Sequence, residues 1–64
     1  MTEKPLYSLL TTEDVAELLQ LDIETIRRYI REGLLKAIKI KGQYRIRRED
    51  FEEFLEERKT RDPP

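Results

Sequence analysis

The sequence contains neither cysteine nor histidine. Without cysteine no disulfide framework can form, and without these two residue types a zinc-finger site cannot be built. We therefore expect no metal chemistry, and the lack of cysteine favours the reducing cytosol. No apolar run approaches the roughly 20 residues that a membrane span needs, and residues 1–7 lack the apolar core of a signal peptide. These absences predict a soluble, cytoplasmic protein.

The chain is also short, which limits the kinds of function it can carry. Its 64 residues form one domain at most. A domain of this size buries only about 60% of its unfolded surface, which leaves no room for a deep catalytic cavity. The sequence offers no set of nucleophile, base and orienting residue. We therefore expect a small binding module without a cofactor, and not an enzyme.

The formal net charge of −1 conceals a segregation of charge along the chain. Residues 1–22 carry −4, residues 23–48 carry +7, and residues 49–64 carry −4. Such a basic middle segment indicates a nucleic-acid binder, because the distribution of charge matters more than its total. The alternative is that 42% charged residues simply solvate a small surface. Solvation alone does not require the signs to segregate.

A first helix is predicted to begin at Thr11, which can act as its N-cap. Asp14 lies three residues later and can complete a capping box. Glu13 and Glu17 are expected to face solvent, away from any phosphate. The predicted apolar stripe comprises Val15, Leu18 and Leu19. Further core positions are expected after the helices, at Leu21, Leu34 and Leu35.

The second predicted helix, residues 22–32, has a cap at each end. Asp22 can accept a hydrogen bond from a free backbone N–H, and Gly33 can adopt the left-handed conformation that ends a helix. Apolar and charged residues fall on opposite sides of it, with Ile26 and Ile30 against Glu24, Arg27, Arg28 and Arg31. The outward side is therefore mostly arginine.

Two short helices joined by about three residues form a helix-turn-helix arrangement, whose second helix lies in the major groove of DNA. Short helical hairpins also occur in proteins that do not bind DNA. Arg27 and Arg28 are the expected base readers, because a guanidinium can bond two acceptors of a guanine edge. Arg31 lies farther out, and Thr25 could contact a phosphate or a thymine methyl group. The competing role for Arg28 is an i,i+4 pair with Glu24, worth about 0.2–0.5 kcal/mol.

A β-hairpin is predicted over residues 38–47, where apolar and basic residues alternate on each side of Gly42. Gly42 is either the second residue of a Lys41-Gly42 loop or the first of a Gly42-Gln43 loop. The predicted faces are Ile38, Ile40, Tyr44 and Ile46 on the core side, with Lys39, Lys41, Arg45 and Arg47 on a cationic side.

Lys39, Lys41 and Arg45 are expected to neutralise phosphates. The alternative for the two lysines is that they block aggregation of an exposed edge strand. Tyr44 is expected to pack its ring on the core, with contact between its hydroxyl and a phosphate as the second option. From Arg48 the pattern is helical again, and its apolar stripe comprises Phe51, Phe54 and Leu55. Residues 1–8 are predicted to be an N-terminal arm and residues 60–64 a C-terminal tail around a domain at 9–59.

The run from Leu9 to Leu55, about three quarters of the chain, resembles the excisionase-type DNA-binding domain, a winged helix-turn-helix of the MerR-like superfamily. The resemblance lies in L-L-T-T-E-D-V-A-E-L-L, T-I-R-R-Y-I-R-E-G-L-L and I-K-I-K-G-Q-Y-R-I-R-R-E-D-F-E-E-F-L. It implies a mainly α fold with a small two-stranded wing, and a prokaryotic or phage DNA-binding role. By position it places Thr25, Arg27, Arg28 and Arg31 on the recognition helix and Lys41, Gly42, Gln43, Tyr44 and Arg45 on the wing.

Two positions depart from the pattern of this family. Gln20 stands where the family often has glycine, which could loosen the turn, and Asp22 stands where it often has serine. The long coiled coil and effector domain of full MerR-type regulators are absent, so we expect no small-molecule ligand.

We therefore expect sequence-specific binding of double-stranded DNA, either as a small transcription regulator or as an excisionase-like architectural factor. The expected partners are DNA together with a second copy on adjacent sites or a recombinase, and the expected location is the nucleoid. The alternative is a protein-interaction module whose basic face binds an acidic partner.

Overall fold

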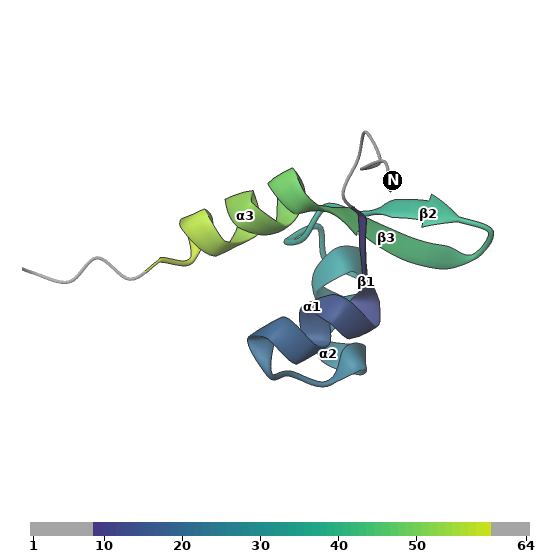
Figure 1. The fold of residues 1–64 in the computed structure, drawn as a ribbon, viewed down its shortest axis with the longest axis horizontal. Coiled ribbons are helices and arrows are strands. Elements are labelled where there is room, and N and C mark those ends of the chain that lie inside the picture. The colour runs from purple at the N-terminus through teal and green to yellow at the C-terminus, as the bar shows by residue number, and fades with distance from the viewer. Residues whose placement is uncertain (1–8, 60–64) are drawn as a thin grey trace, which may run out of the picture.

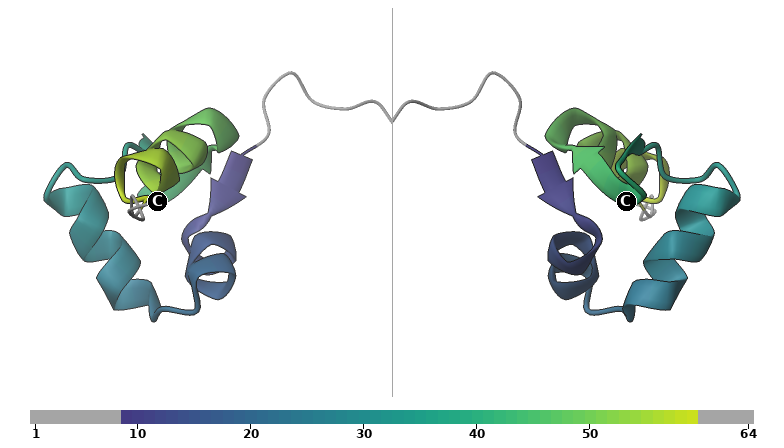
Figure 2. Two further views of the ribbon diagram at one scale, coloured as in Figure 1. Left: turned by 90° about the vertical axis from the view of Figure 1, so that its left-hand side faces the viewer. Right: turned by 90° about the vertical axis from the view of Figure 1, so that its right-hand side faces the viewer.

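The computed structural model describes residues 9–59 as three helices and a small antiparallel sheet (Figures 1 and 2). The elements are β1 (Leu9–Thr11), α1 (Thr12–Leu19), α2 (Ile23–Arg31), β2 (Ile38–Ile40), β3 (Gln43–Arg47) and α3 (Arg48–Glu57). The arm predicted at 1–8 and the tail predicted at 60–64 lie outside the described residues. Figure 1 shows α3 and the β2–β3 loop at opposite ends of the sheet, with α1 and α2 beneath it.

The sheet has three strands in the order β1-β3-β2, whereas the sequence predicted two. The additional strand, β1, pairs with β3 through Leu10 opposite Ile46 and Thr11 opposite Arg45. A strand of three residues is too short to show an alternating pattern, and its last residue, Thr11, is also the N-cap of α1. This pairing attaches the start of α1 to the middle of the sheet.

The core lies where α1, α2, α3 and the inner face of the sheet meet. Its buried apolar side chains are Val15, Ala16, Ile26, Leu35, Ile46, Phe51 and Phe54. On α1 the buried stripe runs through Thr12, Val15 and Ala16 to the partly buried Leu19. The prediction of Leu18 as a core residue is wrong, because this stripe turns it outward and leaves it 60% exposed. The predictions for Leu21, Leu34 and Leu55 are also wrong, since all three are exposed.

Helices α1 and α2 are each followed by the same type of hydrogen-bonded turn. After α2, Gly33 has a φ of 80°, its N–H donates to the Ile30 carbonyl, and the Leu34 N–H donates to the Tyr29 carbonyl at 2.9 Å. This is the Schellman motif, and it confirms the predicted role of Gly33. After α1 the left-handed residue is Gln20, with a φ of 58°. The tight turn predicted between the helices therefore forms around a glutamine.

Helix α3 begins at Arg48, directly after β3, without a side-chain cap. The Arg47 guanidinium instead donates to the Asp50 carboxylate, with Nε and Oδ2 3.0 Å apart, and Asp50 is only 8% exposed. The ring of Phe54 lies 5.6 Å from that of Tyr29 on α2. These contacts hold α3 against the sheet and α2, and they leave the arginine side of α2 uncovered.

Candidate nucleic-acid interface

The outward side of α2 carries three exposed arginines, as predicted: Arg27, Arg28 and Arg31. Glu24 pairs with Arg27, with Oε2 and Nη1 3.0 Å apart, so the competing pair of Glu24 with Arg28 does not form. Within residues 9–59, no hydrogen bond or ion pair engages the guanidinium group of Arg28 or Arg31. Arg28 and Arg31 can therefore bind a ligand without breaking an internal contact.

The first turn of α2 is fixed by Asp22, which confirms its prediction as the N-cap. Its carboxylate accepts hydrogen bonds from the Thr25 backbone N–H and from the Thr25 hydroxyl. The bond from the Thr25 hydroxyl, aided by backbone N–H groups and the charge of Arg28, holds the pKa of Asp22 below its usual range. Since the Thr25 hydroxyl is engaged in this cap, its methyl group is the part left for an outside partner.

The β2–β3 hairpin turns through Lys41 and Gly42, because Ile40 pairs with Gln43. Both loop residues have positive φ, 50° at Lys41 and 77° at Gly42, as the two central residues of a type I′ turn require. Of the two predicted loops, Lys41-Gly42 is therefore the one that forms.

The register of the hairpin shows that its predicted faces are wrong. Residues paired across antiparallel strands share a face, so Lys39 lies on the face of Tyr44, and Ile38 lies on the face of Arg45. Each strand alternates as expected, but a two-residue loop couples the even positions of β2 to the odd positions of β3. The outer face therefore combines arginine with Ile38 and Ile40, which are 40% and 48% exposed.

Two basic side chains of the hairpin lie against their neighbours. The Arg45 guanidinium donates at 3.0 Å to the Gln43 side-chain oxygen and at 3.0 Å to the Tyr44 carbonyl. The Lys39 ammonium lies 5.8 Å from the centre of the Tyr44 ring, within the range of a cation–π contact. Their positive charges are thereby held close to the strands, whereas Lys41 is exposed in the loop.

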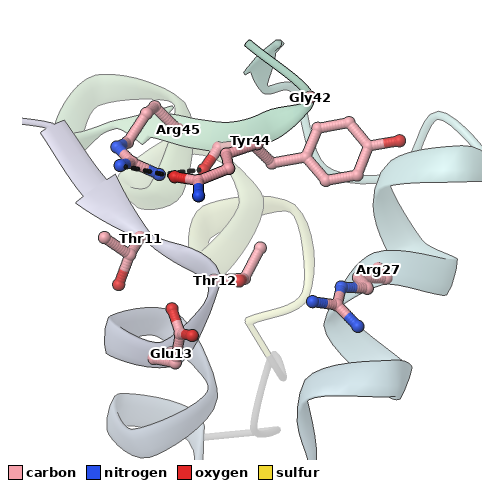
Figure 3. A pocket seen from close by; sticks show the side chains of 8 residues that line it. Thr11, Thr12, Glu13, Arg27, Gly42, Tyr44 and Arg45 are labelled. Carbon is pink, nitrogen blue, oxygen red and sulfur yellow. Dashed lines mark hydrogen bonds between the residues drawn. The ribbon is translucent and has the colours of Figure 1, made fainter. Parts of the chain in front are cut away.

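A cavity of about 290 Å³ lies between α2, the start of α1 and the hairpin (Figure 3). It brings together five of the predicted site residues: Arg27, Gly42, Gln43, Tyr44 and Arg45. Thr25, Arg28, Arg31, Lys39 and Lys41 lie outside its lining. Figure 3 shows Arg27 reaching into this space from α2 while the hairpin passes above it.

Three lining residues, Thr11, Thr12 and Glu13, were not predicted. The predicted capping box at Thr11 is confirmed, since the Asp14 N–H donates to the Thr11 hydroxyl at 2.9 Å. This motif indicated the start of α1 in the sequence. Nothing in the sequence placed this helix end beside the hairpin, however. That proximity follows from the pairing of Thr11 with Arg45, which belongs to the unpredicted strand.

The surface formed by α2 and the β2–β3 hairpin offers polar and positively charged side chains to a partner. Guanidinium groups on α2 can donate paired hydrogen bonds, and the lysine in the hairpin loop can approach an anion. Residues 9–59 contain no cluster of three or more acidic side chains arranged to hold a metal ion. Nor do they contain a helix long and apolar enough to cross a membrane.

Comparison with known proteins agrees with this architecture. Residues 9–59 match the model of a protein family described as a helix-turn-helix domain. No match was found among curated proteins or among solved structures. The family match spans well over half of the chain and includes all three helices and the sheet. The chain therefore belongs to the helix-turn-helix domain family, whose small domains bind DNA and are not enzymes.

Proposed function

We propose that this protein binds specific sequences of double-stranded DNA, with α2 in the major groove and the β2–β3 hairpin as a wing along the backbone. The proposal rests on one observation. Arg27 of α2 lines the same cavity as the hairpin residues Gly42, Gln43, Tyr44 and Arg45, so a duplex that receives α2 would also meet the hairpin. The proposed roles of α2 and the hairpin are those that the resemblance to excisionase-type, MerR-like domains implies.

The arginines of α2 would have different roles. The guanidinium of Arg28 forms no hydrogen bond or ion pair within residues 9–59, and Arg28 is the proposed main base reader, with a discrimination of about 1–3 kcal/mol for a bidentate contact. Arg27 would share in base reading after exchanging its pair with Glu24. Arg31, in the last turn of α2, would contact a phosphate. The Thr25 methyl group could contact a thymine methyl.

The hairpin would supply affinity independent of sequence. Lys41 at the loop, Lys39 and Arg45 would neutralise phosphates, while Gly42 and Gln43 would bring the backbone of the loop close to the duplex. The ring of Tyr44 would hold Lys39 in place. Because the hydrogen bonds of Arg45 fix it to the hairpin, it would act as a positioned charge and not as a base reader.

A single domain of this size buries only about 600–1,000 Å² on DNA, which gives modest specificity. We therefore propose that it acts together with a second copy on an adjacent site or with a recombinase. These assemblies correspond to a small transcription regulator or to an excisionase-like architectural factor in the nucleoid.

The test is selection of duplexes from a random library, followed by titration of the enriched duplex at several salt concentrations. We expect one enriched motif, and an affinity that falls with salt by a slope of about −0.9 per phosphate contact. Repeated half-sites within the motif would show that two copies bind. Failure to enrich any motif, or binding that does not respond to salt, would refute the proposal. Binding to acidic protein but to no duplex would favour the interaction module.

A further inference from the structure

The cavity between α2 and the hairpin contains one carboxylate among its cationic groups. Glu13, in the first turn of α1, lines the cavity together with Arg27 and Arg45. In Figure 3 its side chain extends from α1 toward the hairpin. The sequence predicted that Glu13 would face solvent away from the binding surface. It is exposed, but it faces the space that the proposed duplex would border.

The other roles open to Glu13 are filled by different residues. Asp14 supplies the carboxylate of the capping box, accepting from the Thr11 backbone N–H at 3.0 Å. Arg27 pairs with Glu24, and Arg45 donates to Gln43 and to a backbone carbonyl. Within the described part of the chain, no hydrogen bond or ion pair engages the Glu13 carboxylate. Its negative charge therefore remains available to act on whatever enters the cavity.

We propose that Glu13 restricts phosphate entry into this cavity and thereby increases the preference of the domain for specific over nonspecific duplexes. The proposal rests on the proposed DNA-binding function. Nonspecific binding is driven almost entirely by phosphate neutralisation, so a duplex held loosely samples many positions of its backbone. A carboxylate in the cavity penalises the positions that bring a phosphate close to it. A specific duplex, fixed by the base contacts of α2, keeps its backbone in one position.

The size of the effect follows from electrostatics. A unit charge about 6–8 Å from a phosphate changes a binding constant about threefold in water, and more where the site is partly desolvated. Replacing Glu13 by glutamine retains the length of the side chain and removes the charge. We expect E13Q to bind a mixed-sequence duplex about three- to tenfold more tightly. Its affinity for the duplex selected from the library should stay within about twofold of wild type.

Glu17→Gln provides the matched control. Glu17 is an exposed glutamate of the same helix, it does not line the cavity, and its replacement changes the net charge equally. Glu13→Asp keeps the charge and should retain the wild-type preference. Thermal unfolding of all three variants checks that each is folded at the temperature of the binding measurement.

The binding constants for the two duplexes decide between the possible outcomes. A gain in nonspecific affinity that is larger for E13Q than for E17Q, with wild-type behaviour of E13D, supports the proposal. Equal effects of E13Q and E17Q would show that only net charge matters and would overturn it. Weaker binding of E13Q to the selected duplex would overturn it too, since Glu13 would then be a favourable contact. If the wild type binds no duplex at all, the proposed function itself fails.

Discussion

The hydroxyl of Thr25 donates a 2.7 Å hydrogen bond to the carboxylate of Asp22, so the N-cap of α2 also engages a residue of the proposed DNA-binding surface. The sequence suggested that Thr25 was available for a phosphate and that the charge of Asp22 was awkward beside one. The hydrogen bond accounts for both residues, because it engages the Thr25 hydroxyl and partly neutralises the effect of the Asp22 charge. As long as Asp22 is ionised, its charge is partly satisfied within the first turn and the Thr25 hydroxyl is directed inward.

The first prediction concerns acid stability. The pKa of Asp22 is lowered by folding, so this carboxylate stabilises the fold above the ordinary aspartate pKa of about 3.9. The contribution is lost as the pH falls through the lowered value. Asp22→Asn retains an N-cap acceptor that does not titrate. We expect the stability difference between wild type and D22N, measured by thermal unfolding, to favour wild type less at pH 2 than at pH 7. A difference independent of pH would contradict this assignment.

The second prediction concerns the turn between α1 and α2. Gln20 has a left-handed φ of 58°, a conformation that costs a residue with a side chain roughly 1–2 kcal/mol. Glycine removes this cost but gains entropy in the unfolded chain, about 0.5–1 kcal/mol. We therefore expect Gln20→Gly to stabilise the domain by about 0.5–1 kcal/mol in urea-induced unfolding.

Gly33 provides the opposite control, because it occupies the equivalent position after α2 with a φ of 80°. Nothing lies within 4 Å of where its Cβ would be, so Gly33→Ala adds strain in the backbone and no clash. It should destabilise the domain by about 1 kcal/mol. Destabilisation by both Gln20→Gly and Gly33→Ala would show that the Gln20 side chain has a favourable role of its own.

The contrast between these turns and the hairpin shows what could be predicted from the sequence. Helix ends depend on residues three or four apart, and Thr11, Asp22 and Gly33 are all found in their predicted roles. Which side chains share a face of a hairpin depends on how its two strands pair. A shift of the pairing by one residue moves every side chain of a strand to the opposite face relative to its partner strand. Two loops were compatible with the position of Gly42. Either two-residue loop pairs the even positions of β2 with the odd positions of β3, so Ile38 shares a face with Arg45, and Lys39, although exposed, shares the face of Tyr44.

The candidate site was predictable only in part for a similar reason. Arg27 and the residues of the loop carry their own signals, basic charge at helical spacing and a turn glycine. The cavity between them also requires the start of α1, which is placed by the pairing of β1 with β3. A three-residue strand leaves no pattern to detect, so the position of Glu13 in the lining of this cavity could not be predicted from the sequence.

The third prediction concerns sequence preference. Removing the Arg28 guanidinium by Arg28→Ala should cost about 1–3 kcal/mol on the selected duplex and relax the preference at one or two base pairs. The change should be measured by repeating the selection with the variant. Arg31→Ala removes the same group from the last turn of α2 and should weaken all duplexes without changing the selected motif. If Arg28→Ala gives an unchanged motif, the assignment of Arg28 as a base reader is wrong.

The fourth prediction concerns the hairpin. Lys41→Asn removes a charge at the loop and keeps a residue that tolerates positive φ, so the turn should be preserved. We expect weaker binding to every duplex by a similar factor and a salt slope that is shallower by about 0.9. Titration of selected and mixed-sequence duplexes across salt concentrations measures both quantities. A loss confined to the selected duplex would mean that Lys41 reads bases.

The last prediction tests the corrected position of the core. Ile46 on β3 is fully buried in the core, whereas Leu18 is 60% exposed although both were predicted to be core residues. Removing one methylene by Ile46→Val leaves a small void in close-packed surroundings and should cost about 0.5–1.5 kcal/mol. Leu18→Ala removes more atoms but exposes little that was buried, so its cost should stay below about 0.5 kcal/mol. Urea-induced unfolding of both variants measures these costs. A larger loss for Leu18→Ala would restore the originally predicted stripe on α1.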